Sequence, residues 1–446
     1  MSVNPRWLHT LLSLALPVTL QTALFSSKSM VDTVMLGQLN PLDMAALGLA
    51  TKAQMIVSFC VIGVSMGGGQ ILAQCFNKQV NDKFIRAMLI MLGLAIGVGL
   101  LCAVSLALLS QPIMAFGSTN PTILERGADY LLIISPTLVL FAIALTAATV
   151  LRTMFKPVPA TVISFIGVAL NIGFNILLIE QYGMKGVAYG TLLAASIETL
   201  LLLSYVHCQR WFPIQKLVKI ASVTSLRDSK VVAKLSLIAA LNTVIWSFGL
   251  YVFHALLGKT SDDLLIALGA LAPIESLTLA LLIGFATAAS VIIGNHSGQR
   301  DTKTIRALIP RYITLSLLTG LMLSLTLFAL KPLIIDFITD QALHRETTAN
   351  LAFNVMLLSI SFKGLSMMFI LGILRAGGDA KFCLWVDIFC QWGFLLPCTA
   401  LFISLNIRLE YILLLVVAEE CLKITLCTLR LHFGDWIKVH ADHINA

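Results

Sequence analysis

Charged residues are scarce in this sequence of 446 residues. They make up 12% of the chain, whereas soluble domains carry about 25%. Hydrophobic residues make up 58%, and the mean hydropathy is +0.93. This composition excludes a soluble globular protein and is typical of a polytopic membrane protein. The net charge of +8 comes from short connecting segments and does not indicate nucleic-acid binding.

Motifs of catalysis and metal binding are also missing. The nine cysteines form no CxxC pair and lie mostly in apolar runs, so we interpret them as small hydrophobic residues. The eight histidines show no HExxH spacing, and neither a GxSxG motif nor a Walker loop is present. These absences argue against an intramembrane enzyme, a receptor and a self-contained ATP-driven pump. We expect no metal and no cofactor other than a coupling ion.

The sequence does contain twelve apolar runs, each close to the roughly 20 residues that cross a bilayer as a helix. We therefore predict an all-α polytopic membrane protein with twelve transmembrane helices. The expected spans are about 11–37, 44–73, 87–110, 128–151, 158–180, 185–207, 235–257, 264–294, 308–330, 347–374, 382–405 and 409–429.

Basic residues are distributed unevenly between these runs. The N-terminus, the alternate connections and the C-terminus carry 20 Lys and Arg residues, whereas the opposite connections carry 6. Because cytoplasmic connections are enriched in Lys and Arg, both termini are predicted to be cytoplasmic.

The chain repeats itself with a shift of 221 residues, which overlays segment 14–74 on segment 235–295 without a gap. Each repeat holds six spans, so the two halves share an orientation. We predict two six-helix lobes related by a pseudo-twofold axis along the membrane normal. The expected boundaries are 1–207 for the N-terminal lobe, 208–234 for a polar, basic cytoplasmic linker and 235–446 for the C-terminal lobe.

Asp32 is a single carboxylate inside the first apolar run, one helical turn after Lys28. A charge at the bilayer centre costs roughly 2.5–3.5 kcal/mol on insertion scales, so such residues usually face a partner, water or a substrate. The repeat places Phe253 at the equivalent position of the second half, so Asp32 breaks the internal symmetry. Lys28 is either an ion-pair partner that reduces the cost of insertion or a competitor for the carboxylate.

Several segments share the pattern of one transporter family. They are Asp-Thr-Val-Met-Leu-Gly (32–37), Arg152 followed by a turn with Pro157 and Pro159, Asn171-x-x-x-Asn175, 186–191 and 374–379. Together these segments resemble the multidrug and toxic compound extrusion (MATE) transporters, in particular the DNA-damage-inducible (DinF) branch.

The resemblance implies a secondary-active multidrug efflux antiporter of the bacterial inner membrane. Its substrates would be cationic or amphipathic organic compounds, exported in exchange for protons by alternating access. A sodium-coupled antiporter is the alternative in the same family, and a flippase for lipid-linked precursors is the alternative in the broader superfamily. Mixed embedded charges fit a flippase less well, because phosphates call for a basic cavity. We expect the lipid-embedded monomer to be the functional unit.

Residue by residue, the resemblance implies a proton- or cation-coupling site at Asp32, Asn171, Asn175 and Thr191. Several relatives have Asp where this chain has Asn175, which leaves Asp32 as the main titratable group. Protonation of Asp32 would then promote substrate release. We favour protons because only one carboxylate marks this cluster, whereas sodium prefers several oxygen ligands. Both asparagines also fit a purely structural role between helices.

Other embedded residues give weaker indications. Pro17 lies within the first run and is either a hinge or a static kink. Large apolar side chains are candidates for a drug cavity or for ordinary packing: Met30, Met35, Phe141, Trp246, Met367 and Met368. A second-lobe polar site or a structural pairing is expected at Glu275, Lys363 and Asp387.

Overall fold

A computed structural model describes residues 7–37, 41–77, 80–118, 120–258, 260, 262–341 and 346–444. The chain forms two compact units, each treated by itself below. The N-unit comprises Leu20–Val244 and His440–Ala446, and the C-unit comprises Met1–Thr19 and Ile245–Val439. The division falls inside two helices, α1 and α10. The predicted lobe boundaries remain predictions.

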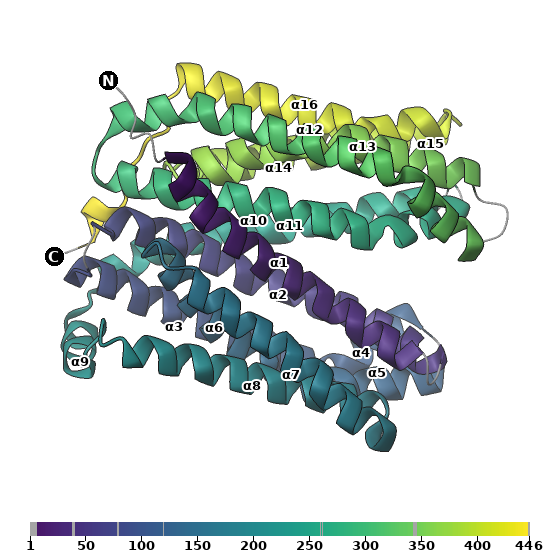
Figure 1. Cartoon of the computed structure of the whole chain (residues 1–446), viewed down its shortest axis with the longest axis horizontal. Coiled ribbons are helices and arrows are strands. Elements are labelled where there is room, and N and C mark those ends of the chain that lie inside the picture. Colours follow the sequence, from purple (N-terminus) through teal and green to yellow (C-terminus); the bar gives the residue numbers. More distant parts are fainter. Residues whose placement is uncertain are drawn as a thin grey trace. The chain divides into compact units, whose positions relative to one another are not determined.

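Helices make up both units (Figure 1). Those of the N-unit, with the two divided helices, are α1 (Trp7–Gly37), α2 (Pro41–Cys75), α3 (Asp82–Leu108), α4 (Ser110–Gly117), α5 (Pro121–Ile134), α6 (Thr137–Thr153), α7 (Val158–Tyr182), α8 (Met184–Cys208), α9 (Ile214–Val223), α10 (Leu226–Gly258) and η3 (Ala441–His443). Those of the C-unit are α11 (Asp262–Gly298), α12 (Thr302–Gln341), α13 (Glu346–Met367), η1 (Met368–Leu374), α14 (Ala380–Asp387), η2 (Ile388–Leu395), α15 (Leu396–Ser404) and α16 (Leu409–Phe433).

All twelve predicted spans fall on these helices. Ten helices among the described residues are long and apolar enough to cross a membrane, or eleven when α5 and α6 count as one bent span. The remaining expected span is α16, which carries the charged residues Glu419, Glu420 and Lys423 near its middle. The prediction of an all-α polytopic membrane protein is confirmed.

The fourth expected span differs from a single helix. Its two parts, α5 and α6, meet at a bend of 43° between Ile134 and Thr137. Pro136 lies at this break, and proline lacks the amide hydrogen that would continue the helical ladder. A similar cause applies to η2, a π-helical segment that ends just before Pro397.

The predicted linker is ordered and helical over much of its length. It contains α9 and the start of α10, which begins nine residues before the expected span at 235. Ser225 and Asp228 form a reciprocal capping pair, with the Asp228 amide donating to Ser225 Oγ at 3.2 Å and the Ser225 amide to Asp228 Oδ2 at 3.3 Å. Arg86 of α3 also donates to Asp228 Oδ2 at 3.0 Å, and both side chains are buried. This anchored cap explains the early start of α10.

Close helix contacts in the N-unit depend on glycines of α2. A Cβ added at Gly63 would lie 2.8 Å from the backbone nitrogen of Ala240 in α10. A Cβ at Gly67 would lie 2.6 Å from the carbonyl oxygen of Leu235. Backbones approach this closely only when a side chain is missing, so both glycines fix the packing of α2 on α10.

We expect Gly63→Ala to destabilise the protein by about 1–3 kcal/mol, because the new methyl group overlaps backbone that cannot rotate away. Gly97→Ala in α3 is the matched control, since nothing lies within 4 Å of the added Cβ. This control should be neutral or more stable by about 0.5–1 kcal/mol, because Ala favours a helix over Gly. Thermal unfolding of the two purified variants in one detergent measures the difference. Equal unfolding temperatures would contradict the assigned contact.

Candidate functional site

The Asp32 carboxylate is buried in the N-unit, with 4% of the residue exposed. Asn175 of α7 donates its Nδ2 hydrogen to Asp32 Oδ1 at 2.6 Å. Thr191 of α8 is a second hydrogen-bond partner of this carboxylate. A buried carboxylate needs such donors, because burial removes the water that otherwise stabilises its charge.

The packing of α7 along α8 brings these partners to Asp32. Asn171 Nδ2 donates to Thr191 Oγ1 at 3.0 Å, and both asparagines are fully buried. Gly190 leaves the room for the Asn175 side chain, since a Cβ there would lie 3.2 Å from the Asn175 backbone nitrogen. The four residues predicted as a coupling site therefore form one connected hydrogen-bonded cluster.

Lys28 lies on the same helix as Asp32 and attracts its carboxylate electrostatically. It also attracts Glu198 of α8. Glu198 accepts a hydrogen bond from Ser164, whose Oγ in turn accepts one from Gln21 Nε2 at 3.1 Å. Lys28 thus faces two carboxylates and is not a dedicated partner of Asp32.

The buried asparagines leave acceptor capacity around the carboxylate. In the described part of the chain, Asn171 Oδ1 and Asn175 Oδ1 accept no hydrogen bond. An amide oxygen of this kind can accept a proton donor or approach a cation. Asn175 and Thr191 stabilise the ionised form of Asp32, and the two amide oxygens are unused acceptors within the same cluster.

The remaining described candidates from the N-terminal half lie outside the hydrogen-bonded cluster of Asp32. Pro17 lies inside α1, two residues before the division of the two units. Met35 packs against the apolar core of the N-unit, and Phe141 stacks on Phe25 with ring centroids 5.2 Å apart. The side chain of Met30 lies outside the described residues.

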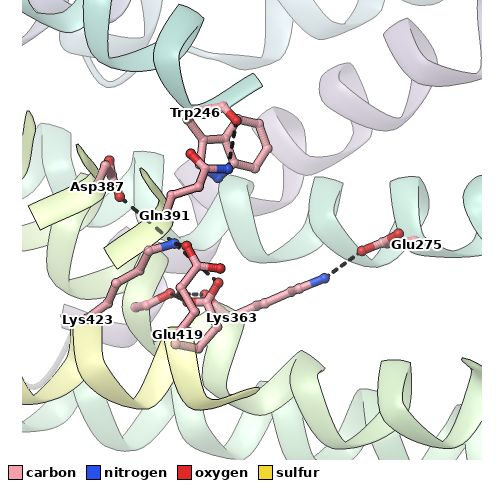
Figure 2. A network of polar contacts seen from close by, with 9 residues as sticks. Trp246, Glu275, Lys363, Asp387, Gln391, Glu419 and Lys423 are labelled. Carbon is pink, nitrogen blue, oxygen red and sulfur yellow. Dashed lines mark hydrogen bonds and ion pairs between the residues drawn. The ribbon is translucent and has the colours of Figure 1, made fainter. Parts of the chain in front are cut away.

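The C-terminal cavity candidates are placed as packing residues. Met367 packs against the apolar core of the C-unit, and Met368 is 1% exposed. The carbonyl oxygen of Trp246 accepts a hydrogen bond from Gln391 Nε2 at 3.0 Å (Figure 2). Their role as drug-cavity residues stays a prediction.

The C-unit holds a second polar network (Figure 2). Lys363 of α13 donates to Glu275 Oε1 of α11 at 2.6 Å, so these two predicted residues form a pair. Asp387, the third predicted residue, is instead 4.0 Å from Lys423 Nζ of α16.

Lys423 is the centre of this network. Its Nζ lies 2.7 Å from Glu419 Oε1 and 3.5 Å from Glu420 Oε1, and all three residues are buried. Ser366 of α13 forms a hydrogen bond with Glu420 Oε2. We name Asp387, Glu419, Glu420 and Lys423 the α16 network.

Comparisons with known proteins agree on one family. Residues 17–177 and again residues 239–401 match the same family model, MatE, in keeping with the internal repeat. The probable multidrug resistance protein NorM of Chromobacterium violaceum is 26% identical over 307 residues, which cover 66% of this chain and 64% of that protein. The uncharacterized transporter YisQ of Bacillus subtilis is 21% identical over 448 residues, covering 96% of this chain and 95% of that protein.

Solved structures share the fold over 95% of the chain. A MATE crystal structure in complex with MaL6 has a TM-score of 0.86 at 15% identity and covers 95% of this chain and 96% of its own. A MATE in a bent conformation has a TM-score of 0.83 at 15% identity, covering 95% of both chains. A MATE in a straight conformation has a TM-score of 0.81 at 16% identity, covering 95% of this chain and 96% of its own.

A double-mutant cycle tests the Glu275–Lys363 pair. We expect Glu275→Gln and Lys363→Met each to lower the thermal unfolding temperature more than the double variant does, because a single change leaves one embedded charge unpaired. The coupling energy should be about 0.5–3 kcal/mol. The control cycle uses the exposed pair of Lys185 and Asp129, 2.9 Å apart, and should give about 0–1 kcal/mol. Additive effects at Glu275 and Lys363 would contradict a coupled pair.

Proposed function

The chain belongs to the MatE family, and from this premise we propose that it exports cationic or amphipathic organic compounds in exchange for protons. The family match confirms a multi-pass membrane transporter and not an enzyme. One observation carries the finer proposal: Asp32 is buried inside a cluster of neutral hydrogen-bond donors and acceptors. The hydrogen-bond partners of the carboxylate are neutral, and Lys28 is the charged group that attracts it, so protonation of Asp32 weakens its hold on Lys28 or on a cation in the same place.

In the proposed cycle the ionised Asp32 holds a cationic substrate, and a proton that enters from outside the cell displaces it. Asn175 and Thr191 stabilise the ionised carboxylate while the site is loaded. Once the carboxyl is protonated, its attraction for the cation is lost and the substrate leaves. Each inward proton contributes roughly 2.3 kcal/mol per 100 mV of membrane potential, which supplies work for export. Lys28 would compete for Asp32 and Glu198 when the site is empty.

Sodium is the second candidate for the coupling ion. The observation in its favour is the pair of amide oxygens at Asn171 and Asn175 that accept no hydrogen bond among the described residues. Hard cations bind carboxylate, carbonyl and amide oxygens. The presence of a single carboxylate in the cluster favours the proton, which needs only one basic oxygen.

The location follows from the same proposal. We place the protein as a monomer in a bacterial inner membrane with both termini in the cytoplasm. The supporting observation is the excess of Lys and Arg in the alternate connections, which the positive-inside rule assigns to the cytoplasm.

We expect Asp32→Asn to abolish proton-driven export, because the amide keeps the hydrogen bonds but cannot exchange a proton. Uptake of ethidium from the medium into everted vesicles, with proton and sodium gradients imposed separately, measures this directly. Glu180→Gln, at an exposed position near the end of α7, is the matched control and should export like wild type. Full proton-driven export by Asp32→Asn would falsify the proposal. If the wild-type protein exports ethidium only under a sodium gradient, the coupling ion is sodium and not the proton.

Pro17→Ala tests the hinge in α1. Restoring the amide hydrogen at position 17 stiffens the helix, so we expect export to slow severalfold while equilibrium binding of ethidium stays unchanged. Pro332→Ala, at an exposed position of α12, is the control for a general effect of removing a helical proline. If Pro17→Ala weakens binding and transport equally, or affects neither, the residue is a static kink.

A further inference from the structure

The short helix α9 follows directly on the end of a membrane span. α8 ends at Cys208, and Arg210, with a φ of 53°, turns the chain out of that helix. The carbonyl oxygen of Pro213 then accepts the amide hydrogens of Lys216 and Leu217 at 2.9 and 3.0 Å, which starts α9. Figure 1 shows α9 at the end of the N-unit, crossing the direction in which α8 runs. α9 therefore runs along the membrane surface and not through the membrane.

Two sides of α9 differ in what covers them. Ile220 is buried, and Phe212, just before the helix, stacks on Phe84 of α3 with ring centroids 6.4 Å apart. Ile214 and Val218, one turn apart, form an apolar stripe and are 61% and 64% exposed. Because each residue advances by about 100° around a helix, this stripe lies on a different side from Ile220. The N-unit therefore leaves the stripe uncovered, and the apolar phase beside the end of a span is lipid.

The remaining side of α9 is polar, and the linker 208–234 around it is basic. This linker contains six Lys and Arg residues but one acidic residue, Asp228, which pairs with Arg86. Lys216 Nζ lies 2.8 Å from Asp82 Oδ1 of α3, which leaves five of the six basic residues. These five are exposed and have no ion pair among the described residues: Arg210, Lys219, Arg227, Lys230 and Lys234.

An aromatic pair lies where α8 gives way to α9. Trp211 packs edge-on against Tyr205 of α8, with ring centroids 6.3 Å apart. Lys156 Nζ lies 4.1 Å from the centre of the Trp211 ring. Tryptophan and tyrosine are enriched at the level of the lipid headgroups, and lysine side chains there keep the ammonium group in water. This group of side chains therefore marks the headgroup level next to α9.

We propose that α9 lies in the headgroup layer of the bilayer and binds anionic phospholipids. Ile214 and Val218 pack against the upper part of the acyl chains, and Arg210 and Lys219 bind the headgroup phosphates. An anionic lipid fits both features, because it offers an apolar chain to the stripe and a net negative charge to the unpaired cations. A lipid without net charge would cover the stripe but leave the basic excess uncompensated. This inference is independent of the compound that the protein exports.

Local fluorescence quenching tests the proposal in the full-length protein. A bimane label is attached at Val218→Cys, after the exposed Cys208 and Cys421 are replaced by serine. The protein is placed in nanodiscs that contain equal parts of phosphatidylglycerol and phosphatidylcholine, with bromine on the acyl chains of one lipid or the other. We expect brominated phosphatidylglycerol to quench about twofold more strongly, because basic side chains concentrate anionic lipid around α9.

The same label at Met322→Cys is the matched control. Met322 is 68% exposed near the middle of α12, far from the headgroups, so both brominated lipids should quench it equally. Absence of quenching at Val218→Cys by either lipid would overturn the proposal, because the stripe would then face water or a protein. Equal quenching by the two lipids at Val218→Cys would overturn the choice of an anionic partner.

Removing charge at α9 tests the role of the two basic residues beside the stripe. In Arg210→Gln with Lys219→Gln, we expect the excess quenching by phosphatidylglycerol at Val218→Cys to disappear while quenching by phosphatidylcholine persists. Salt at about 1 M should reduce the wild-type excess in the same way, since it shortens the range of the attraction to about 3 Å. The control is Arg306→Gln with Lys381→Gln, two exposed basic residues of the C-unit, and should keep the excess. An unchanged excess after the loss of Arg210 and Lys219 would contradict their contact with lipid headgroups.

Discussion

Charges inside an apolar helix bundle must be compensated, and this requirement shapes the interior of both units. An ionised group that leaves water without a partner costs more free energy than a membrane protein can easily recover by packing. The described interior accordingly keeps its charges close to donors, acceptors or opposite charges. Arg86 with Asp228 illustrates the structural use of such a pair, because the pair anchors the first turn of α10.

The two units meet this requirement by different chemistry. The N-unit gives Asp32 neutral hydrogen-bond partners, an amide and a hydroxyl group, with Lys28 as a charged neighbour on the same helix. The C-unit uses opposite charges, with Lys423 between three carboxylates. Two halves that share one ancestral pattern have thus placed their titratable groups on different helices.

Parts of the candidate site were predictable because the determining signals are local. Four-residue spacing placed Asn171 and Asn175 on one face of α7. The resemblance to a transporter family identified these asparagines, Asp32 and Thr191 as a group, and the structure brings all four together.

Other features were not predictable, because sequence spacing says nothing about which helices pack together. Lys28 was the expected neighbour of Asp32, yet Asn175, 143 positions away, makes the direct hydrogen bond. Glu420 and Ser366 were missed as a pair, since no local motif relates residues 54 positions apart. The only available signal was the unusual sequence Glu419-Glu420 within an apolar run.

The amino-acid sequence by itself determined the class of this protein. The length of the apolar runs, the low content of charged residues and the internal repeat are all visible in the sequence. Bilayer thickness and helix geometry are enough to infer the class of protein from them. Only the tertiary structure decided which embedded charges meet and how many remain uncompensated. That result depends on distances of a few ångströms between α7, α8, α13 and α16, where the energy of a charge changes steeply with the position of its partner.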